Sequence, residues 1–131
     1  MAAVSMMEGY FDKYGYIDKN GSQIIPFIFD DAHSFHFDGK FANVKVESKW
    51  GIINRLGNQI VPCIYDEVSY FHDTLAIFKI NAKCGYINKT GKIVIDAIYD
   101  EADGFIEGIA KIKVNSQYGY IDKKGEQYWE D

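Results

Sequence analysis

Two of the three histidines in this chain occupy equivalent positions in a repeated pattern, an arrangement that could indicate a metal site. His36 and His72 each follow a phenylalanine directly, and His33 lies nearby. A zinc site draws several histidine, cysteine or carboxylate ligands together at characteristic spacings. The next occurrence of the pattern has Ile106 instead of histidine, and no cysteine or carboxylate pair follows at such a spacing. We therefore expect polar loop residues and no bound metal.

Acidic pairs also recur in the pattern, and carboxylates held close together can bind calcium or act as a general acid and base. The pairs are Asp30-Asp31, Asp66-Glu67 and Asp100-Glu101. A catalytic pair needs two unlike environments, whereas these pairs recur in one repeated environment. We expect them to cap turns in connecting segments. No serine lies in a G-x-S-x-G elbow and no glycine-rich phosphate loop is present, so the sequence predicts a protein that is not an enzyme and needs no cofactor.

The two cysteines, Cys63 and Cys84, lie at different places in the repeated pattern. A disulfide framework tends to show regular, even spacings of cysteine. We therefore expect two reduced, largely buried thiols without a chemical role.

Composition limits the class of protein. The chain has 131 residues, 47% of them hydrophobic and 16% aromatic, with a formal net charge of −5. This length suits one domain, residues 1–131, and the aromatic content favours strands. The acidic balance argues against direct binding of nucleic acid or an anionic membrane. Residues 1–8 lack the features of a signal peptide, so we expect a cytoplasmic location, with non-classical secretion left open.

One motif occurs four times and defines the organisation of the chain. Its glycines are Gly15, Gly51, Gly85 and Gly119, which are 36, 34 and 34 residues apart. Periods of 20–50 residues indicate solenoids, propellers or repeat arrays. The sequence thus divides into repeats of approximately 14–49, 50–83 and 84–117, followed by a half repeat, 118–131.

Each repeat is expected to form a three-stranded antiparallel meander. In residues 109–114, apolar and lysine residues alternate, as in a strand with one solvated face. Tight turns are predicted where Asp or Asn precedes Gly by three positions, at Asp18 to Gly21, Asn54 to Gly57, Asn88 to Gly91 and Asp122 to Gly125. Proline after the third strand suits a strand end, and the aromatic residues Phe29, Tyr65 and Tyr99 are expected to pack the linker onto the meander.

Meanders of this size must stack to bury their faces. We expect an open β-repeat array, with a small closed propeller-like or barrel-like ring as the alternative. The N-terminal strand is predicted to be shortened to about residues 9–11, which does not suit ring closure. An open array exposes strand edges, so either the terminal half repeat caps it or identical chains meet there as a homodimer.

The motif resembles the WG repeat, also called the KWG repeat, of bacterial proteins. The resemblance covers Tyr14 to about Tyr128, although Trp50-Gly51 is the one copy with the eponymous dipeptide and Ile52 replaces the usual tyrosine. It implies a β-rich repeat module used for binding other macromolecules. The family pattern brings no catalytic motif that could be transferred to this chain.

Two functions are compatible with these patterns. The first is a non-catalytic protein-interaction module, of the kind used by an inhibitor or immunity-type protein, with Trp50, Tyr16, Tyr86 and Tyr120 as candidate binding residues. The second is carbohydrate or cell-envelope binding through an aromatic ladder. That ladder would consist of Tyr14, Trp50 and Tyr118, or of Tyr16, Tyr86 and Tyr120. Exposure of the rings distinguishes the two, and we expect burial in the core because exposed aromatic patches are limited on monomers.

Overall fold

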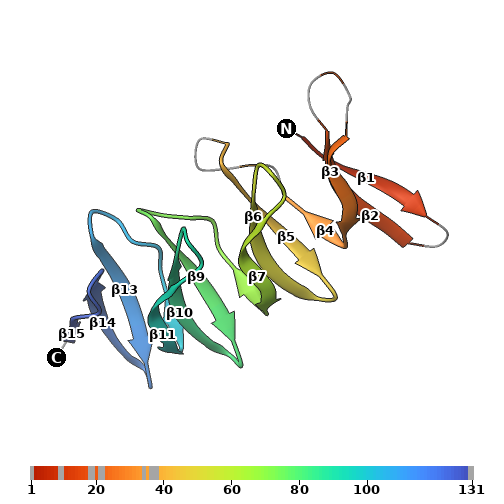
Figure 1. Ribbon diagram of the computed structural model, residues 1–131. Coiled ribbons are helices and arrows are strands. Elements are labelled where there is room, and N and C mark those ends of the chain that lie inside the picture. The colour runs from red at the N-terminus through yellow and green to blue at the C-terminus, as the bar shows by residue number, and fades with distance from the viewer. Residues whose placement is uncertain are drawn as a thin grey trace. The chain divides into compact units, whose positions relative to one another are not determined.

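The computed structural model describes residues 2–8, 11–17, 20, 23–33, 35 and 39–129, and every regular element in them is a β-strand (Figure 1). The strands form four antiparallel sheets, each with two separate edge strands, so none of these sheets closes into a barrel. The predicted all-β repeat architecture is confirmed. Within the described part of the chain, no helix is long and apolar enough to cross a membrane.

Contacts divide the chain into two units, Met1–Tyr65 and Asp66–Asp131. The first unit contains sheet A, with strands β1 (Ala2–Glu8), β2 (Phe11–Ile17) and β3 (Gln23–Phe29), and sheet B, with strands β4 (Asp31–Ala32), β5 (Phe41–Val46), β6 (Lys49–Asn54) and β7 (Gln59–Tyr65). The second unit contains sheet C, with strands β8 (Glu67–Val68), β9 (Leu75–Ile80), β10 (Lys83–Asn88) and β11 (Ile93–Tyr99), and sheet D, with strands β12 (Glu101–Ala102), β13 (Ile109–Val114), β14 (Gln117–Asp122) and β15 (Gln127–Trp129).

Each sheet contains the predicted meander, and sheets B, C and D gain a short fourth strand from the linker. In sheet C, Glu67 pairs with Lys79 and Val68 pairs with Phe78. The linker therefore adds a strand at the edge of the meander that follows it. One sequence repeat thus supplies the last two strands of one sheet and the first two of the next.

The N-terminal strand is complete, which corrects the prediction of a shortened strand at about residues 9–11. Strand β1 pairs with β2 along seven residues, and Val4 lies opposite Gly15 as Val44 lies opposite Gly51. Eleven positions separate Val4 from Gly15, but seven separate Val44 from Gly51. Because this hairpin is longer, the spacing of the sequence did not reveal the complete meander of sheet A. Residues 9 and 10 lie outside the described residues.

The motif glycine lies beneath a bulge of the neighbouring strand. Between two paired positions of sheet C, β10 has one residue, Gly85, whereas β11 has three. A β-carbon on Gly85 would lie 2.5 Å from the carbonyl oxygen of Ile95 and 2.8 Å from the amide nitrogen of Ala97. At Gly51 the carbonyl oxygen of Val61 would lie 2.4 Å away. The position therefore requires glycine because another backbone approaches it closely.

The prolines lie within strands and not at strand ends as predicted. Pro26 is inside β3 and Pro62 is inside β7, each the edge strand of its sheet. Pro62 occupies the bulge where the register of β6 and β7 shifts. Proline is tolerated there because a bulged edge residue need not donate an N–H group to the ladder.

The predicted turns after the second strand are present where the structure describes them. The Asn54 side chain accepts hydrogen bonds from the amides of Leu56 and Asn58, both at 3.0 Å. Its carbonyl accepts from Gly57, which has φ +86°. The same bonds form at Asn88 and Asp122. The remaining predicted turn, at Asp18 to Gly21, has both of these residues outside the described part.

Each unit has a hydrophobic core between its two sheets. The first core includes Phe29 and the second includes Tyr99. Both residues are buried, as is Tyr65 at the end of β7. The prediction that these linker aromatics pack into the core is confirmed.

Candidate binding surface

Two of the predicted binding residues, Tyr16 and Tyr86, are core residues with no exposed surface. The Tyr16 hydroxyl donates to the carbonyl of His33 at 2.7 Å, and the Tyr86 hydroxyl donates to the carbonyl of Asp103 at 2.6 Å. Burial raises the pKa of Tyr86 far above its ordinary value. The linker that follows each sheet covers these rings, so neither can contact a partner, and the three-membered ladder of Tyr16, Tyr86 and Tyr120 does not form.

Trp50 is half-buried on β6. Its ring centroid lies 5.0 Å from that of His33, with the planes tilted by 38°, and the Lys45 ammonium lies 5.7 Å from it. These contacts within the first unit fix the ring. Trp50 therefore offers part of its surface to a partner.

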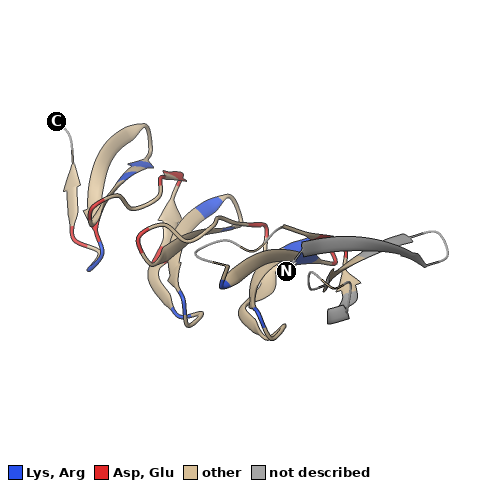
Figure 2. Cartoon of the chain, turned by 90° about the horizontal axis from the view of Figure 1, so that it is seen from above, with Lys and Arg blue, Asp and Glu red and all other residues tan. Residues whose placement is uncertain are grey.

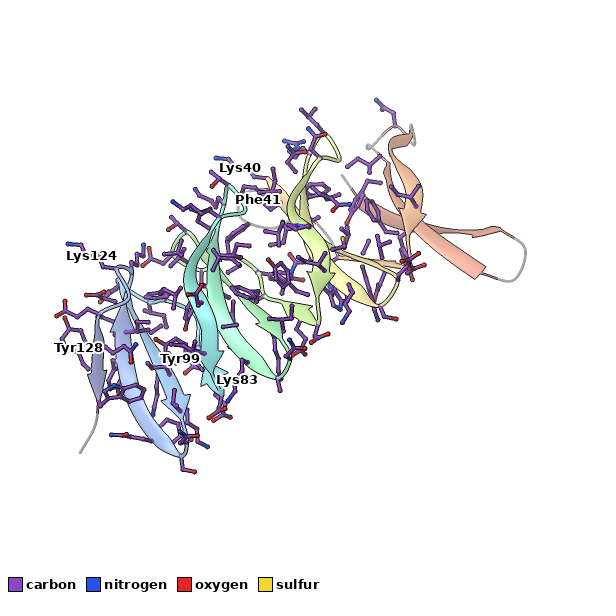
Figure 3. The ribbon with its side chains drawn as sticks, turned by 60° about the horizontal axis from the view of Figure 1, so that its bottom comes forward. Lys40, Phe41, Lys83, Tyr99, Lys124 and Tyr128 are labelled. Atoms are coloured by element: carbon purple, nitrogen blue, oxygen red, sulfur yellow. The ribbon has the colours of Figure 1, made fainter. Side chains whose placement is uncertain are left out.

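Tyr120 differs from its buried counterparts because it lies on the last sheet. Its side chain is 37% exposed, and the described residues after it form only β15, which pairs beside it in the same sheet. Tyr118 is 41% exposed two positions earlier, and Tyr128, directly opposite Tyr120, is 49% exposed. Figure 3 labels Tyr128 on β15. Alternation along strands places these three rings on one face of sheet D.

Two lysines complete this surface. Lys111 pairs with Tyr120 and Lys113 pairs with Tyr118 in the register of β13 and β14. We call the surface formed by Lys111, Lys113, Tyr118, Tyr120 and Tyr128 the terminal aromatic face. The sequence patterns do not indicate the two lysines or Tyr128 as binding residues. The alternation of residues 109–114 indicates a solvated face. It does not show that this face belongs to the last sheet, where no further sheet of the described chain covers it.

Two lysine ammonium groups lie beside the rings of the terminal aromatic face. The ammonium groups of Lys111 and Lys113 lie 4.6 and 5.1 Å from the centroid of Tyr118, within the range of cation–π contact. Lys113 also forms a salt bridge with Glu101 at 3.3 Å, which raises its pKa. Acidic and basic residues are interspersed along the rest of the chain (Figure 2). The face therefore combines aromatic area with fixed positive groups.

A pocket of about 280 Å³ adjoins these residues, lined by Glu101, Asp103, Lys111, Lys113 and Tyr118 among others. A related pocket of about 460 Å³ on sheet C is lined by Glu67, Lys79 and Cys84 together with the linker Asp100 to Asp103. The two pockets occupy equivalent places on consecutive sheets. On sheet C the following linker crosses this place.

The acidic pairs have structural roles, although their location differs from the predicted linker turn. Asp100 accepts a hydrogen bond from the amide of Asn115 at 2.8 Å, in the hairpin of the meander that follows. Asp66 accepts from Asn81 at 3.2 Å in the same way. Both capped residues have positive φ and begin two-residue hairpin loops, whose backbone needs this conformation. Asp30 caps the corresponding hairpin of sheet B at Glu47.

The cysteines and histidines are not among the residues of the terminal aromatic face. Cys63 and Cys84 are both free thiols, Cys84 buried and Cys63 partly buried, and burial raises the pKa of each. A raised pKa disfavours the reactive thiolate. Among the described residues, no group of three potential metal ligands comes together. His36 lies outside the described residues.

A family model for the WG containing repeat matches residues 14–50, 50–84 and 85–118. These matches follow one another across most of the chain and agree with the spacing of the motif glycines. No curated protein and no solved structure matches the sequence.

Proposed function

Because this chain belongs to the WG repeat family, we propose that it is a non-catalytic protein-interaction module that binds its partner through the terminal aromatic face. The observation that carries the proposal is the exposure of Tyr118, Tyr120 and Tyr128 on one face of sheet D. The tyrosines that correspond to Tyr120 in earlier sheets, Tyr16 and Tyr86, are buried.

The composition of this face supports a protein partner. Tyrosine is enriched in the anchoring residues of protein interfaces, where its ring supplies apolar area and its hydroxyl a hydrogen bond. Lys111 and Lys113 adjoin the rings and favour a partner with carboxylates or carbonyls at the rim. An inhibitor or immunity-type protein would use such a rigid surface to cover a site on its target.

A non-catalytic role agrees with the uses already found for the acidic pairs. Asp66 and Asp100 are occupied in capping hairpins, while Glu67 and Glu101 form salt bridges with lysines of the adjacent strand. These carboxylates therefore have a recurring structural function.

Affinity capture tests the proposal. The chain serves as bait in a lysate of its source, beside Tyr120→Ala and the matched variant Tyr70→Ala, which replaces another exposed tyrosine. We expect one enriched protein with wild type and Tyr70→Ala, and a loss of about tenfold or more with Tyr120→Ala if this ring is an anchor. Equal capture by all three folded variants would contradict the assignment of the face.

Carbohydrate binding is the second candidate, favoured by the adjacent rings of Tyr120 and Tyr128. Exposed aromatic rings side by side can stack on sugar rings. A parallel pull-down on insoluble glycans distinguishes the candidates. Retention on polysaccharide that depends on Tyr120, without an enriched protein, would replace the protein-binding proposal.

A further inference from the structure

We propose that the terminal aromatic face binds the N-terminal sheet of a second copy of this chain, so that copies join head to tail. The inference rests on the proposed function and names the partner. It uses the face of a sheet, whereas the homodimer expected from the sequence would use strand edges.

The terminal aromatic face corresponds to the face through which an earlier sheet packs on the sheet that follows it. In the second unit, Tyr86 of sheet C packs in one core with Ala110 and Ile112 of sheet D. Tyr86 lies opposite Ile77 in its sheet, and Tyr120 lies opposite Lys111 at the equivalent positions of sheet D. Tyr120 therefore occupies the position from which each earlier tyrosine contacts the following sheet.

Sheet A has, at equivalent positions, residues like those with which a sheet packs on the one before it. Ala2 lies opposite Ile17 in the register of β1 and β2, as Ala110 lies opposite Ile121 in sheet D. At the next equivalent position, Val4 lies opposite Gly15. In sheet D these positions hold the residues that pack against sheet C. Sheet A thus has the backbone register and the residue types of a sheet that follows another.

Charge and symmetry select the head-to-tail contact. Lys113 is paired with Glu101, but two terminal aromatic faces placed against each other would bring Lys111 of both copies to one interface, and like charges repel. The corresponding positions of sheet A include Ala2 and Val4, which are apolar. A contact between different faces is heterologous and continues until it closes or forms a chain of copies.

Analytical ultracentrifugation of the full chain tests the proposal, over a range of about 1 to 500 µM that brackets weak specific association. We expect wild type to form dimers and larger species as concentration rises. Tyr120→Lys blocks the terminal face, and Val4→Lys blocks sheet A because its charge would meet the lysines of that face, so each variant alone should remain monomeric. Mixed together, they should form a 1:1 dimer and nothing larger, because the mixture retains one intact pair of faces.

Leu56→Lys is the matched control, since Leu56 is an exposed turn residue far along the sequence from both faces, and it should associate like wild type. Circular dichroism and thermal unfolding check that each variant folds. If Val4→Lys does not fold, Ala2→Lys replaces it, because Ala2 lies on the same alternation of β1.

Three outcomes would overturn the proposal: a wild type that is monomeric throughout, a mixture that fails to dimerise, or a Val4→Lys variant that dimerises alone. The last would indicate contact between two terminal aromatic faces. A monomeric wild type that still captures another protein through Tyr120 would retain the proposed function and reject the second copy as the partner.

Discussion

At the scale of single residues, equivalent positions of the repeat are buried in one sheet and exposed in another. Tyr86 and Tyr120 both follow the motif glycine, yet Tyr86 is buried with its hydroxyl bonded to Asp103, whereas Tyr120 is exposed. The following sheet makes the difference. A tyrosine of the motif is a core residue wherever the array continues past it.

Removal of the two hydroxyls should therefore have unequal effects. We expect Tyr86→Phe to lower the free energy of unfolding by about 1–2 kcal/mol, because it deletes a buried hydrogen bond to a carbonyl. Tyr120→Phe, the same change on an exposed ring, should have an effect within about 0.5 kcal/mol. Urea unfolding of both variants provides the comparison. Equal losses would mean that the Asp103 bond does not stabilise the fold.

The motif glycine gives a second prediction at this scale. Gly85→Ala should destabilise the protein by about 2–4 kcal/mol, because its β-carbon would overlap the backbone of β11 and force the bulge apart. Gly108→Ala is the control in the same unit, with φ +82° and no atom within 4 Å of a new β-carbon. It should cost about 1 kcal/mol, from backbone conformation alone. A Gly85→Ala variant as stable as the control would contradict the steric explanation.

At the scale of elements, the linker aspartate ties each connecting segment to the hairpin that follows it. Asp100 accepts from the Asn115 amide and pairs with the Lys83 ammonium, so one carboxylate joins the linker to β10 of sheet C and to the hairpin loop between β13 and β14 of sheet D. Asp100 also donates its own amide to the carbonyl of Lys113 at 2.8 Å. The linker is therefore held by side chain and backbone together.

This linkage predicts a pH dependence. The Lys83 ammonium, followed by the Asn115 amide, holds the pKa of Asp100 below its ordinary value of 3.8. A lowered pKa stabilises the folded state above the ordinary value, and that contribution disappears as the pH falls through the folded pKa. The difference in unfolding free energy between wild type and Asp100→Asn should thus be constant above about pH 5 and shrink below about pH 4.

Denaturant unfolding between about pH 2.5 and 7 measures this difference, over the range in which carboxylates titrate. Asp96→Asn, an exposed carboxylate in β11, serves as the control. A stability difference for Asp100→Asn that does not change with pH would show that the carboxylate charge has no part in the linkage.

At the scale of the whole molecule, the two units each contain two sheets and a core of their own. Repeat proteins gain stability from the intrinsic contribution of each module and from contacts between neighbours. A unit with its own core needs less from its neighbour than a single meander does.

We therefore predict that residues 66–131 fold when produced alone. Circular dichroism should show a β-sheet spectrum and a cooperative thermal transition, with stability no greater than about 3–5 kcal/mol for a domain this small. Residues 84–131, which lack β8 and β9, are the matched truncation and should not fold. A spectrum of unfolded chain for residues 66–131 would mean that the core between sheets C and D is insufficient.

The repeat, most of the strands and the turns could be predicted from the sequence, because these depend on local spacing. The Asx turns at Asn54 and Asn88 and the aromatic residues Phe29 and Tyr99 were predictable since each uses interactions encoded within a few neighbouring positions. The bulge above Gly85 was not predictable, because alternation does not reveal which backbone will cross a given residue.

The exposure of the aromatic residues could be known only from the tertiary structure. Tyr16, Tyr86 and Tyr120 all lie in a Gly-Tyr-Ile sequence, and their exposure depends on whether another sheet packs over them. The N-terminal strand β1 was likewise recognised from its pairing with β2, since its longer hairpin breaks the sequence spacing. Local interactions therefore determine the structure of each meander. The exposed surface depends on which sheets are neighbours, because residues distant in sequence bury one another.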